Sequence, residues 1–181
     1  MRGFVAFGLA EGISAELFAA VKELEAQPGL SLLHSADYHV TLKFLSEFSS
    51  ERFFQCLPEL CALGPPPRDS LVAKQITHWP TVLALECEAS PELERWQREL
   101  NELLEKNGFL KERHPKFRPH VTLARRKPET KLPALGVWLE KNSGAFEGRG
   151  LGIRHAALWR SRAPETGRRH EELLCPLFST S

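Results

Sequence analysis

Four consecutive residues, His39-Val40-Thr41-Leu42, recur letter for letter as His120-Val121-Thr122-Leu123 in this chain of 181 residues. The chain has only 7 histidines, so a second copy of the tetrad needs a physical cause. Side chains alternate between the two faces of a strand, which places His and Thr of each copy on one face and Val and Leu on the other. We therefore expect two similar half-polar strands whose His/Thr faces meet at one cleft.

Each copy of the tetrad follows the same order of expected elements. A strand at residues 2–9 and a helix capped by Ser14 precede the first motif strand, at residues 38–45. A strand at 81–88 and a helix at 91–107 precede the second, at 120–124. This order predicts an α+β fold: bilobal and pseudo-symmetric, with two antiparallel sheets lining a central cleft and helices outside.

The remaining segments complete this outline. We expect a short edge strand at 30–33, a helix from Ser49 or Ser50 that Pro58 breaks or bends, and a connector at 64–67. A strand at 70–76, a helix at 132–142 and late strands at 152–160 and 173–178 follow. The length suits one core, so residues 1–181 are expected to form a single domain of two intertwined lobes.

The charge pattern is local rather than global. A formal net charge of +1 gives no general preference for nucleic acid or a membrane. Basic residues nevertheless gather on both sides of the second tetrad and near the C-terminus: Lys111, Arg113, Lys116, Arg118, Arg125, Arg126, Lys127 and Lys131, then Arg149, Arg154, Arg160, Arg162, Arg168 and Arg169. This pattern predicts a local anion-binding surface, with a solvated basic face as the alternative.

The N-terminal stretch at residues 1–9 is too short for a membrane span and lacks the pattern of a signal peptide, so we expect a cytoplasmic protein with no membrane partner. Cys56, Cys61, Cys87 and Cys175 form no CxxC pair, which favours free thiols and no structural zinc. A monomer is expected, because the cleft is built within one chain.

Two facing histidines can supply an acid and a base together, because a neutral imidazole accepts a proton and an imidazolium donates one. Hydrolysis of a phosphodiester needs these two transfers, one from the attacking water and one to the departing alkoxide. Threonine hydroxyls can hold the non-bridging phosphate oxygens, and a nearby cation can neutralise the charge that grows at phosphorus. Such a site needs no metal or other cofactor.

The segments HVTLKFL at 39–45 and PHVTLARR at 119–126 resemble the two HxTx motifs of the two-histidine phosphoesterases. They are most similar to those of the bacterial RNA 2′,3′-cyclic phosphodiesterases, historically called 2′-5′ RNA ligases. The opening RGFVAF, the approach Phe117-Arg118-Pro119 and the late stretch Leu158-Trp159-Arg160-Ser161, followed by Gly167, are similar as well. The resemblance covers nearly the whole chain.

The resemblance implies hydrolysis of a 2′,3′-cyclic phosphate at an RNA end to leave a 2′-phosphate. It makes His39 the proton donor to the leaving 3′-oxygen and His120 the proton acceptor that activates water. Thr41 and Thr122 would hold phosphate oxygens. Lys43, where the family often has Arg, and Arg125 would add positive charge at the substrate.

Some residues depart from the family pattern or allow a second interpretation. His170 stands where the family commonly has Tyr, and we expect it to be structural or exposed, like the other histidines outside the tetrads. Phe117 and Trp159 are candidates for stacking on a base, with packing as the alternative.

Three functions remain open at this stage. The first is the metal-independent cyclic phosphodiesterase acting on RNA or oligonucleotide ends. The second keeps the site but acts as a 2′-5′ phosphodiesterase or joins tRNA halves through a 2′-5′ bond. The third is a non-catalytic module that binds RNA ends.

Overall fold

The computed structural model describes residues 2–110, 116–127, 131–161 and 169–174. Its strands are β1 (Arg2–Leu9), β2 (Leu30–Leu32), β3 (His39–Glu47), β4 (Leu71–His78), β5 (Val82–Ala89), β6 (His120–Arg126), β7 (Ile153–Ser161) and β8 (His170–Leu174). Its helices are α1 (Glu11–Val21), α2 (Ser50–Gln55), α3 (Leu57–Leu63), α4 (Pro91–Lys106) and α5 (Pro133–Asn142), with 3-10 turns η1 (Lys22–Leu24) and η2 (Ser35–Asp37).

The strands form one antiparallel sheet in the order β4-β5-β6-β3-β1-β7-β8, with β2 pairing to β6. Extensive ladders join neighbouring strands within β4-β5-β6 and within β3-β1-β7-β8. In contrast, β3 and β6 pair in the described structure at Val40 and Val121 alone. The α+β fold predicted from the sequence is confirmed. The two expected sheets are its two halves, which this single pair joins into one sheet.

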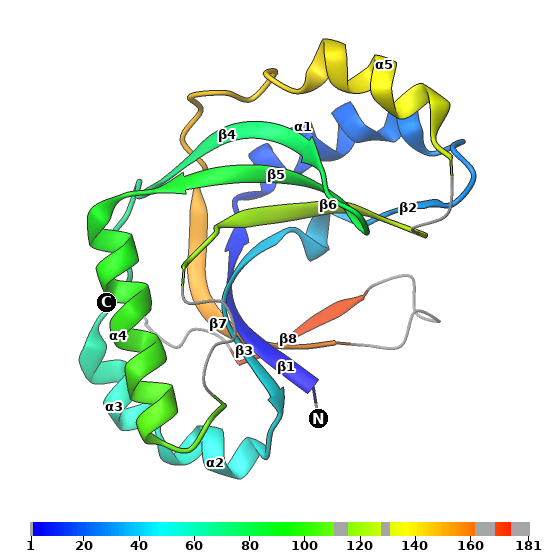
Figure 1. Ribbon diagram of the computed structural model, residues 1–181. Coiled ribbons are helices and arrows are strands. Elements are labelled where there is room, and N and C mark those ends of the chain that lie inside the picture. The colour runs from blue at the N-terminus through cyan, green and yellow to red at the C-terminus, as the bar shows by residue number, and fades with distance from the viewer. Residues whose placement is uncertain (1, 111–115, 128–130, 162–168, 175–181) are drawn as a thin grey trace.

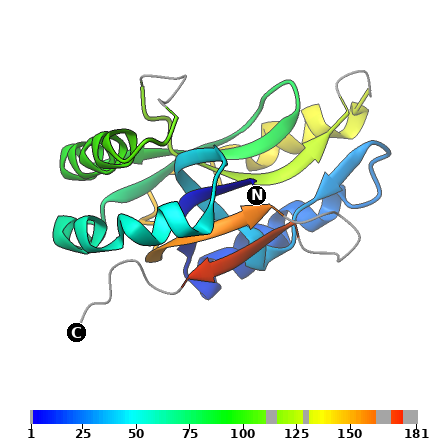
Figure 2. The same cartoon turned by 90° about the horizontal axis from the view of Figure 1, so that it is seen from below.

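The helices pack on one face of the sheet. Their buried side chains and the inward-facing strand residues form one large hydrophobic core, which includes Leu17 of α1, Leu60 of α3, Leu100 of α4 and Trp138 of α5. A separate small cluster on β1 and β7 contains only strand residues, Phe4, Ala6, Ala157 and Trp159. Figure 1 shows α1 with α5 at one end of the molecule and α2, α3 and α4 at the other; Figure 2 shows the same groups from below.

Local chemistry sets several helix boundaries as expected. The Ser49 hydroxyl accepts a hydrogen bond from the Arg52 amide at the start of α2, and the Ser90 hydroxyl accepts one from Leu93 at the start of α4. Pro58 ends the first of these helices, because it fits only in the first turn of a new helix, α3. The predicted break at Pro58 is confirmed.

Two boundaries differ from the sequence prediction. Helix α1 begins at Glu11, after Ala10, so Ser14 lies inside the helix and does not cap it. The apolar stripe of this helix already starts at Ile13, which requires one more N-terminal turn. The last strand spans His170–Leu174, where it pairs with β7, and residues 175–178 of the predicted strand lie outside the described residues.

Candidate active site

The two tetrads occupy equivalent places in the two halves of the sheet. Thr41 pairs with Ala6 of β1, and Thr122 pairs with Ala84 of β5. In both strands the leucine that follows, Leu42 or Leu123, is an extra residue that forms a β-bulge and points into the core. The repeat in the sequence therefore encodes a repeated local geometry, bulge included.

The bulges change the face on which the next residues lie. By strict alternation Lys43 would share the face of Thr41, but the bulge places it opposite the buried Val5 instead. By the same shift in the second copy, Ala124 enters the core and Arg125 moves to the face of Thr122, opposite Val82. The same kind of β-bulge thus turns Lys43 away from the cleft face in the first copy and brings Arg125 to that face in the second.

Lys43 is therefore a correction to the sequence prediction. Its side chain is 0% exposed, and its Nζ lies 3.0 Å from Glu105 Oε1 of α4, on the helix face of the sheet. The sequence pattern could not reveal this, because alternation counted without the bulge gives the opposite face. Lys43 holds α4 to β3, and the register places it on the opposite face of the sheet from Thr41.

The two imidazoles are held in the same way. His39 Nδ1 lies 2.6 Å from the carbonyl oxygen of Asp37, and His120 Nδ1 lies 2.9 Å from that of Arg118, in each case two residues upstream. A carbonyl can only accept, so each Nδ1 carries a hydrogen and donates it. In both neutral rings Nε2 is then the unprotonated nitrogen, available to accept or, after protonation, to donate.

The pairing of Val40 with Val121 brings the four polar side chains together. In an antiparallel register the residues that flank this pair lie opposite one another, His39 facing Thr122 and Thr41 facing His120. Each histidine is thus beside the threonine of the other tetrad, and the two histidines are diagonal neighbours, with Cβ atoms about 7–8 Å apart by standard sheet geometry. All four side chains are half-buried.

His39 packs into an aromatic wall. Its ring stacks on Phe4 at 4.7 Å between centroids and lies 5.6 Å from the ring of Trp159 and 4.9 Å, edge on, from that of His170. The pKa of His39 is lowered to about 3, mainly because burial disfavours the charged imidazole, with smaller contributions from the positive charges of His170, His120 and Arg125. Because the charge of Arg125 contributes to the lowered pKa of His39, Arg125 lies near the site.

His120 has a different neighbourhood. The Trp79 ring meets it edge on at 4.7 Å, the Arg118 guanidinium lies 5.2 Å from the Trp79 centroid, and Arg118 pairs with Glu86 at 3.6 Å. Burial lowers the pKa of His120, partly offset by the hydrogen bond to the Arg118 carbonyl. Both imidazoles therefore favour the neutral state in the free protein.

Several of the basic residues already have carboxylate partners. Arg149 pairs with Glu16 at 2.6 Å, Arg154 with Glu172 at 2.9 Å and Arg160 with Glu171 at 2.5 Å. Carboxylates therefore neutralise these three arginines of the expected anion-binding surface. Of the two stacking candidates, Phe117 packs against the large core, and Trp159 is 2% exposed beside His39.

Sequence reasoning missed three contacts of the histidines. Phe4 was detectable, because alternation along the first strand puts it on the same face as Ala6 and Gly8. Trp79 lies in the turn between β4 and β5, where nothing local marks it. His170 was expected to be structural or exposed; it is 7% exposed and reaches His39 only because β8 folds beside β7.

The described residues hold no cluster of three or more His, Cys, Asp or Glu side chains able to bind a metal ion. Within the described residues Cys56, Cys61 and Cys87 form no disulfide, and Cys175 lies outside those residues. Within the part of the chain that the structure describes, no helix is long and apolar enough to cross a membrane.

Comparison with solved structures finds the same fold over nearly the whole chain. A protein of Thermus thermophilus, TT0787, matches with a TM-score of 0.72 and 24% identity, over 96% of each chain. A structure described as a phosphoesterase matches with a TM-score of 0.66 and 20% identity, over 96% of this chain and 95% of that one. E. coli LigT complexed with 3′-AMP matches with a TM-score of 0.65 and 19% identity, over the same shares.

At the level of sequence, a search of curated proteins finds no significant match. A family model described as the 2′-5′ RNA ligase superfamily matches residues 13–164, a stretch that contains both tetrads and Arg125. With the repeated HxTx strands and their shared geometry, this match establishes that the chain belongs to the 2′-5′ RNA ligase superfamily of two-histidine phosphoesterases.

Proposed function

We propose that the protein hydrolyses 2′,3′-cyclic phosphodiester ends of RNA to 2′-phosphomonoesters without a metal ion. The observation that carries this proposal is the matched pair of imidazoles, each with Nδ1–H donated to a carbonyl two residues upstream and Nε2 left for chemistry. A site with two such groups across one cleft suits a reaction that takes a proton on one side of phosphorus and gives one on the other. Membership of a phosphoesterase superfamily supports the same reaction class.

In the proposed reaction the cyclic phosphate lies between the histidines. His120 Nε2 accepts a proton from water as the new P–O bond forms, and His39 Nε2 donates a proton to the ribose 3′-oxygen as its bond to phosphorus breaks. The Thr41 and Thr122 hydroxyls donate hydrogen bonds to the non-bridging oxygens. Arg125 neutralises charge that grows at phosphorus. The direction of proton flow follows the family resemblance.

The proton on His39 is supplied together with the substrate in this mechanism. In the free protein the pKa of His39 is lowered to about 3, so its imidazole is neutral near pH 7. A phosphate anion bound beside Nε2 favours the imidazolium and raises this pKa. The acid therefore becomes competent only when the anion is present, and the free site stays neutral.

The test is hydrolysis of a 2′,3′-cyclic nucleotide in excess chelator, with the position of the phosphate in the product identified by NMR. We expect the 2′-phosphate from the wild type and a loss of several orders of magnitude in kcat for His39→Ala and for His120→Ala. His34→Asn is the matched control, because His34 is exposed and asparagine can also cap η2. Full activity in either alanine variant would refute the paired roles.

A second candidate, 2′-5′ ligation or 2′-5′ phosphodiester cleavage, is favoured by the description of the matching family. Ligation is the reverse of the same chemistry, with a 5′-hydroxyl in place of water at His120. Incubation of cyclic-phosphate RNA with and without a 5′-hydroxyl acceptor distinguishes the two, because only ligation produces a 2′-5′ bond. Binding of the cyclic-phosphate RNA with no product at all would favour a non-catalytic module.

The same proposal treats the chain as one domain that works as a monomer, because both halves of the sheet contribute to one site. It also places the protein in the cytoplasm. Sedimentation of the active protein tests the monomeric state. Activity that rises with association of the chain would contradict it.

A further inference from the structure

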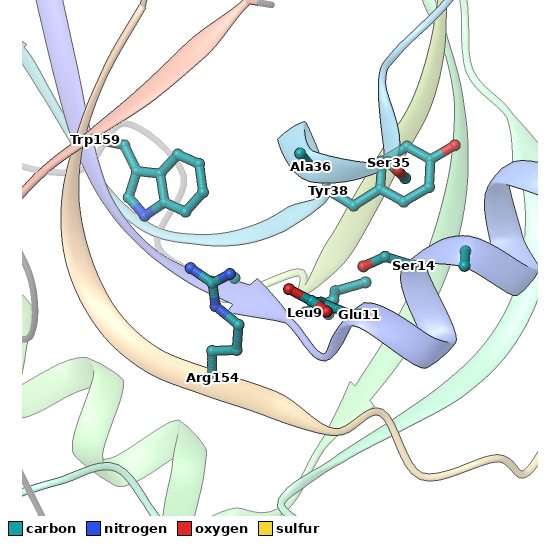
Figure 3. A pocket seen from close by; sticks show the side chains of 10 residues that line it. Leu9, Glu11, Ser14, Ser35, Ala36, Tyr38, Arg154 and Trp159 are labelled. Atoms are coloured by element: carbon teal, nitrogen blue, oxygen red, sulfur yellow. The ribbon is translucent and has the colours of Figure 1, made fainter.

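A cavity of about 300 Å³ opens beside the proposed active site. It lies between the end of β1, the first turns of α1, the turn η2 and strand β7 (Figure 3). Its apolar walls include Leu9, Ala15, Ala36 and Trp159. None of the roles assigned above to the histidines, threonines or Arg125 uses this space.

The cavity adjoins His39 rather than His120. Gly8, which lines it, is the residue that pairs with His39 in the β1–β3 ladder, and Trp159, which also lines it, lies 5.6 Å from the His39 ring. A Cβ on Gly8 would come within 3.2 Å of Arg154 Nε and 3.6 Å of the Trp159 indole. The glycine therefore leaves room beside Arg154 and Trp159 that a side chain would fill.

The polar groups of the cavity are mixed and nearly balanced in charge. Glu11, Ser14, Ser35 and Arg154 line it, and the charge of Arg154 is already matched by Glu172 at 2.9 Å. Ser14 is 6% exposed, and Figure 3 shows its hydroxyl directed into the cavity. The buried Trp159 Nε1 has no acceptor among the described residues.

Such a lining suits a flat neutral ring better than a phosphate. A heterocyclic base offers both donors and acceptors, which can satisfy a carboxylate, hydroxyls and a guanidinium at once, and its faces fit against apolar walls. A phosphate would meet the Glu11 carboxylate and an arginine that is already paired. Buried polar groups without a partner, such as the Trp159 N–H at this cavity, are rare, which favours a bound partner.

The direction of the reaction fixes which part of the substrate lies there, and this step rests on the proposed function. The leaving 3′-oxygen stays on the ribose of the terminal nucleotide, so that ribose must lie on the side of the proton donor, His39. The base attached to it then extends away from the phosphate on the same side. The cavity next to His39 is the space available to it.

We infer that this cavity is the subsite for the nucleobase of the terminal nucleotide, and that Ser14, Glu11 and Arg154 contact the edge of the base. The substrate class is therefore a nucleoside cyclic phosphate or an RNA end, and the base contributes to binding. A sugar cyclic phosphate without a base is a poor substrate. The cavity also gives the protein a means to distinguish one base from another.

The variant Ala15→Trp tests this inference by closing the cavity from its rim without removing any of its polar groups. Ala19→Trp, four residues further along α1 and equally exposed, is the matched control outside the cavity. Substrates are the four nucleoside 2′,3′-cyclic phosphates and ribose 2,3-cyclic phosphate without a base. Thermal melts of both variants establish that they fold.

For the wild type we expect kcat/KM to be at least about tenfold higher with a base than without one. Ala15→Trp should raise KM for the nucleosides by about tenfold, leave kcat unchanged and leave the base-free substrate unaffected, while Ala19→Trp behaves as wild type. Ser14→Ala should change the relative preference among the four bases. Equal loss on all substrates, or no effect of Ala15→Trp, would overturn the inference.

Calorimetric binding of a nucleoside 2′-phosphate and of ribose 2-phosphate separates failure of this inference from failure of the proposed function. If the wild type hydrolyses none of the substrates, the proposed reaction is wrong. A binding preference for the nucleoside that Ala15→Trp abolishes would still support a base in the cavity. Equal binding of the two ligands by the wild type would refute it.

Discussion

The buried ion pair between Lys43 and Glu105 gives a prediction that separates stability from catalysis. The Lys43 ammonium is 0% exposed, whereas the Glu105 side chain is 29% exposed. Glu105→Gln therefore leaves a fully buried charge without its partner, and Lys43→Met leaves a carboxylate that water can still reach. Removal of one member of a buried pair costs about 3–5 kcal/mol when the remaining charge is desolvated.

The two variants should therefore differ in stability. For Glu105→Gln we expect a loss of about 3 kcal/mol in the free energy of unfolding, at the lower end of that range because the carboxylate that is lost was itself partly solvated. In a chain of this size this corresponds to a fall of about 6–12 °C in Tm. Lys43→Met should cost about 1 kcal/mol or less, because methionine fills a similar volume in the core.

Urea titration and thermal melts measure the stabilities, and kcat/KM on a 2′,3′-cyclic nucleotide at room temperature measures the function. Both variants should retain activity within about threefold, because the bulge at Leu42 turns Lys43 away from Thr41. A loss of two orders of magnitude in Lys43→Met with unchanged stability would refute this reasoning and return Lys43 to the phosphate site. Unchanged stability in Glu105→Gln would refute the buried pair.

Three further predictions concern the histidine site. Because the pKa values of His39 and His120 are both lowered in the free protein, kcat/KM should be highest below pH 6.5 and fall as pH rises and the protonated imidazole is lost. His170→Phe removes an electrostatic influence that lowers the pKa of His39, so a pH–rate profile should show a higher kcat/KM on the falling limb than in the wild type. Thr41→Val and Thr122→Val should each lower kcat/KM by about 10–1,000-fold in steady-state assays with an unchanged melt, and full activity would argue against the hydroxyls as phosphate donors. Phe4→Ala should cost about 3–5 kcal/mol in urea unfolding and raise the pKa of His39 by admitting water to its ring; an unchanged imidazole titration by NMR would contradict burial as the main cause of the shift.

What the sequence revealed depended on how local the governing chemistry is. The cap at Ser49 and the break at Pro58 were predictable because each rests on one residue and its next turn. The outward faces of His39 and His120 were predictable because two residues of strand suffice to fix them. The alternation of side chains between the two faces gave the wrong face for Lys43, because a β-bulge at Leu42 precedes it. Such a bulge depends on the partner strand, which the local sequence does not reveal.

Contacts between distant segments were beyond sequence reasoning. His170 is far from His39 along the chain, and only the pairing of β8 with β7 brings them together. The start of α1 was misjudged because a good capping residue, Ser14, lay within an apolar stripe that already required a helix. The cavity beside His39 depends on four separate elements, so no motif could mark it.

The single pair that joins the two halves of the sheet has a consequence for the spacing of the acid and the base. Val40 and Val121 are both fully buried, and they form the only described pairing between the strands that carry the two imidazoles. The packing of these two side chains therefore helps to set the distance between the two imidazoles, and a phosphate must fit within that distance. A substitution at either position changes this distance, and with it the range of substrates that fit, while every reacting group stays in place.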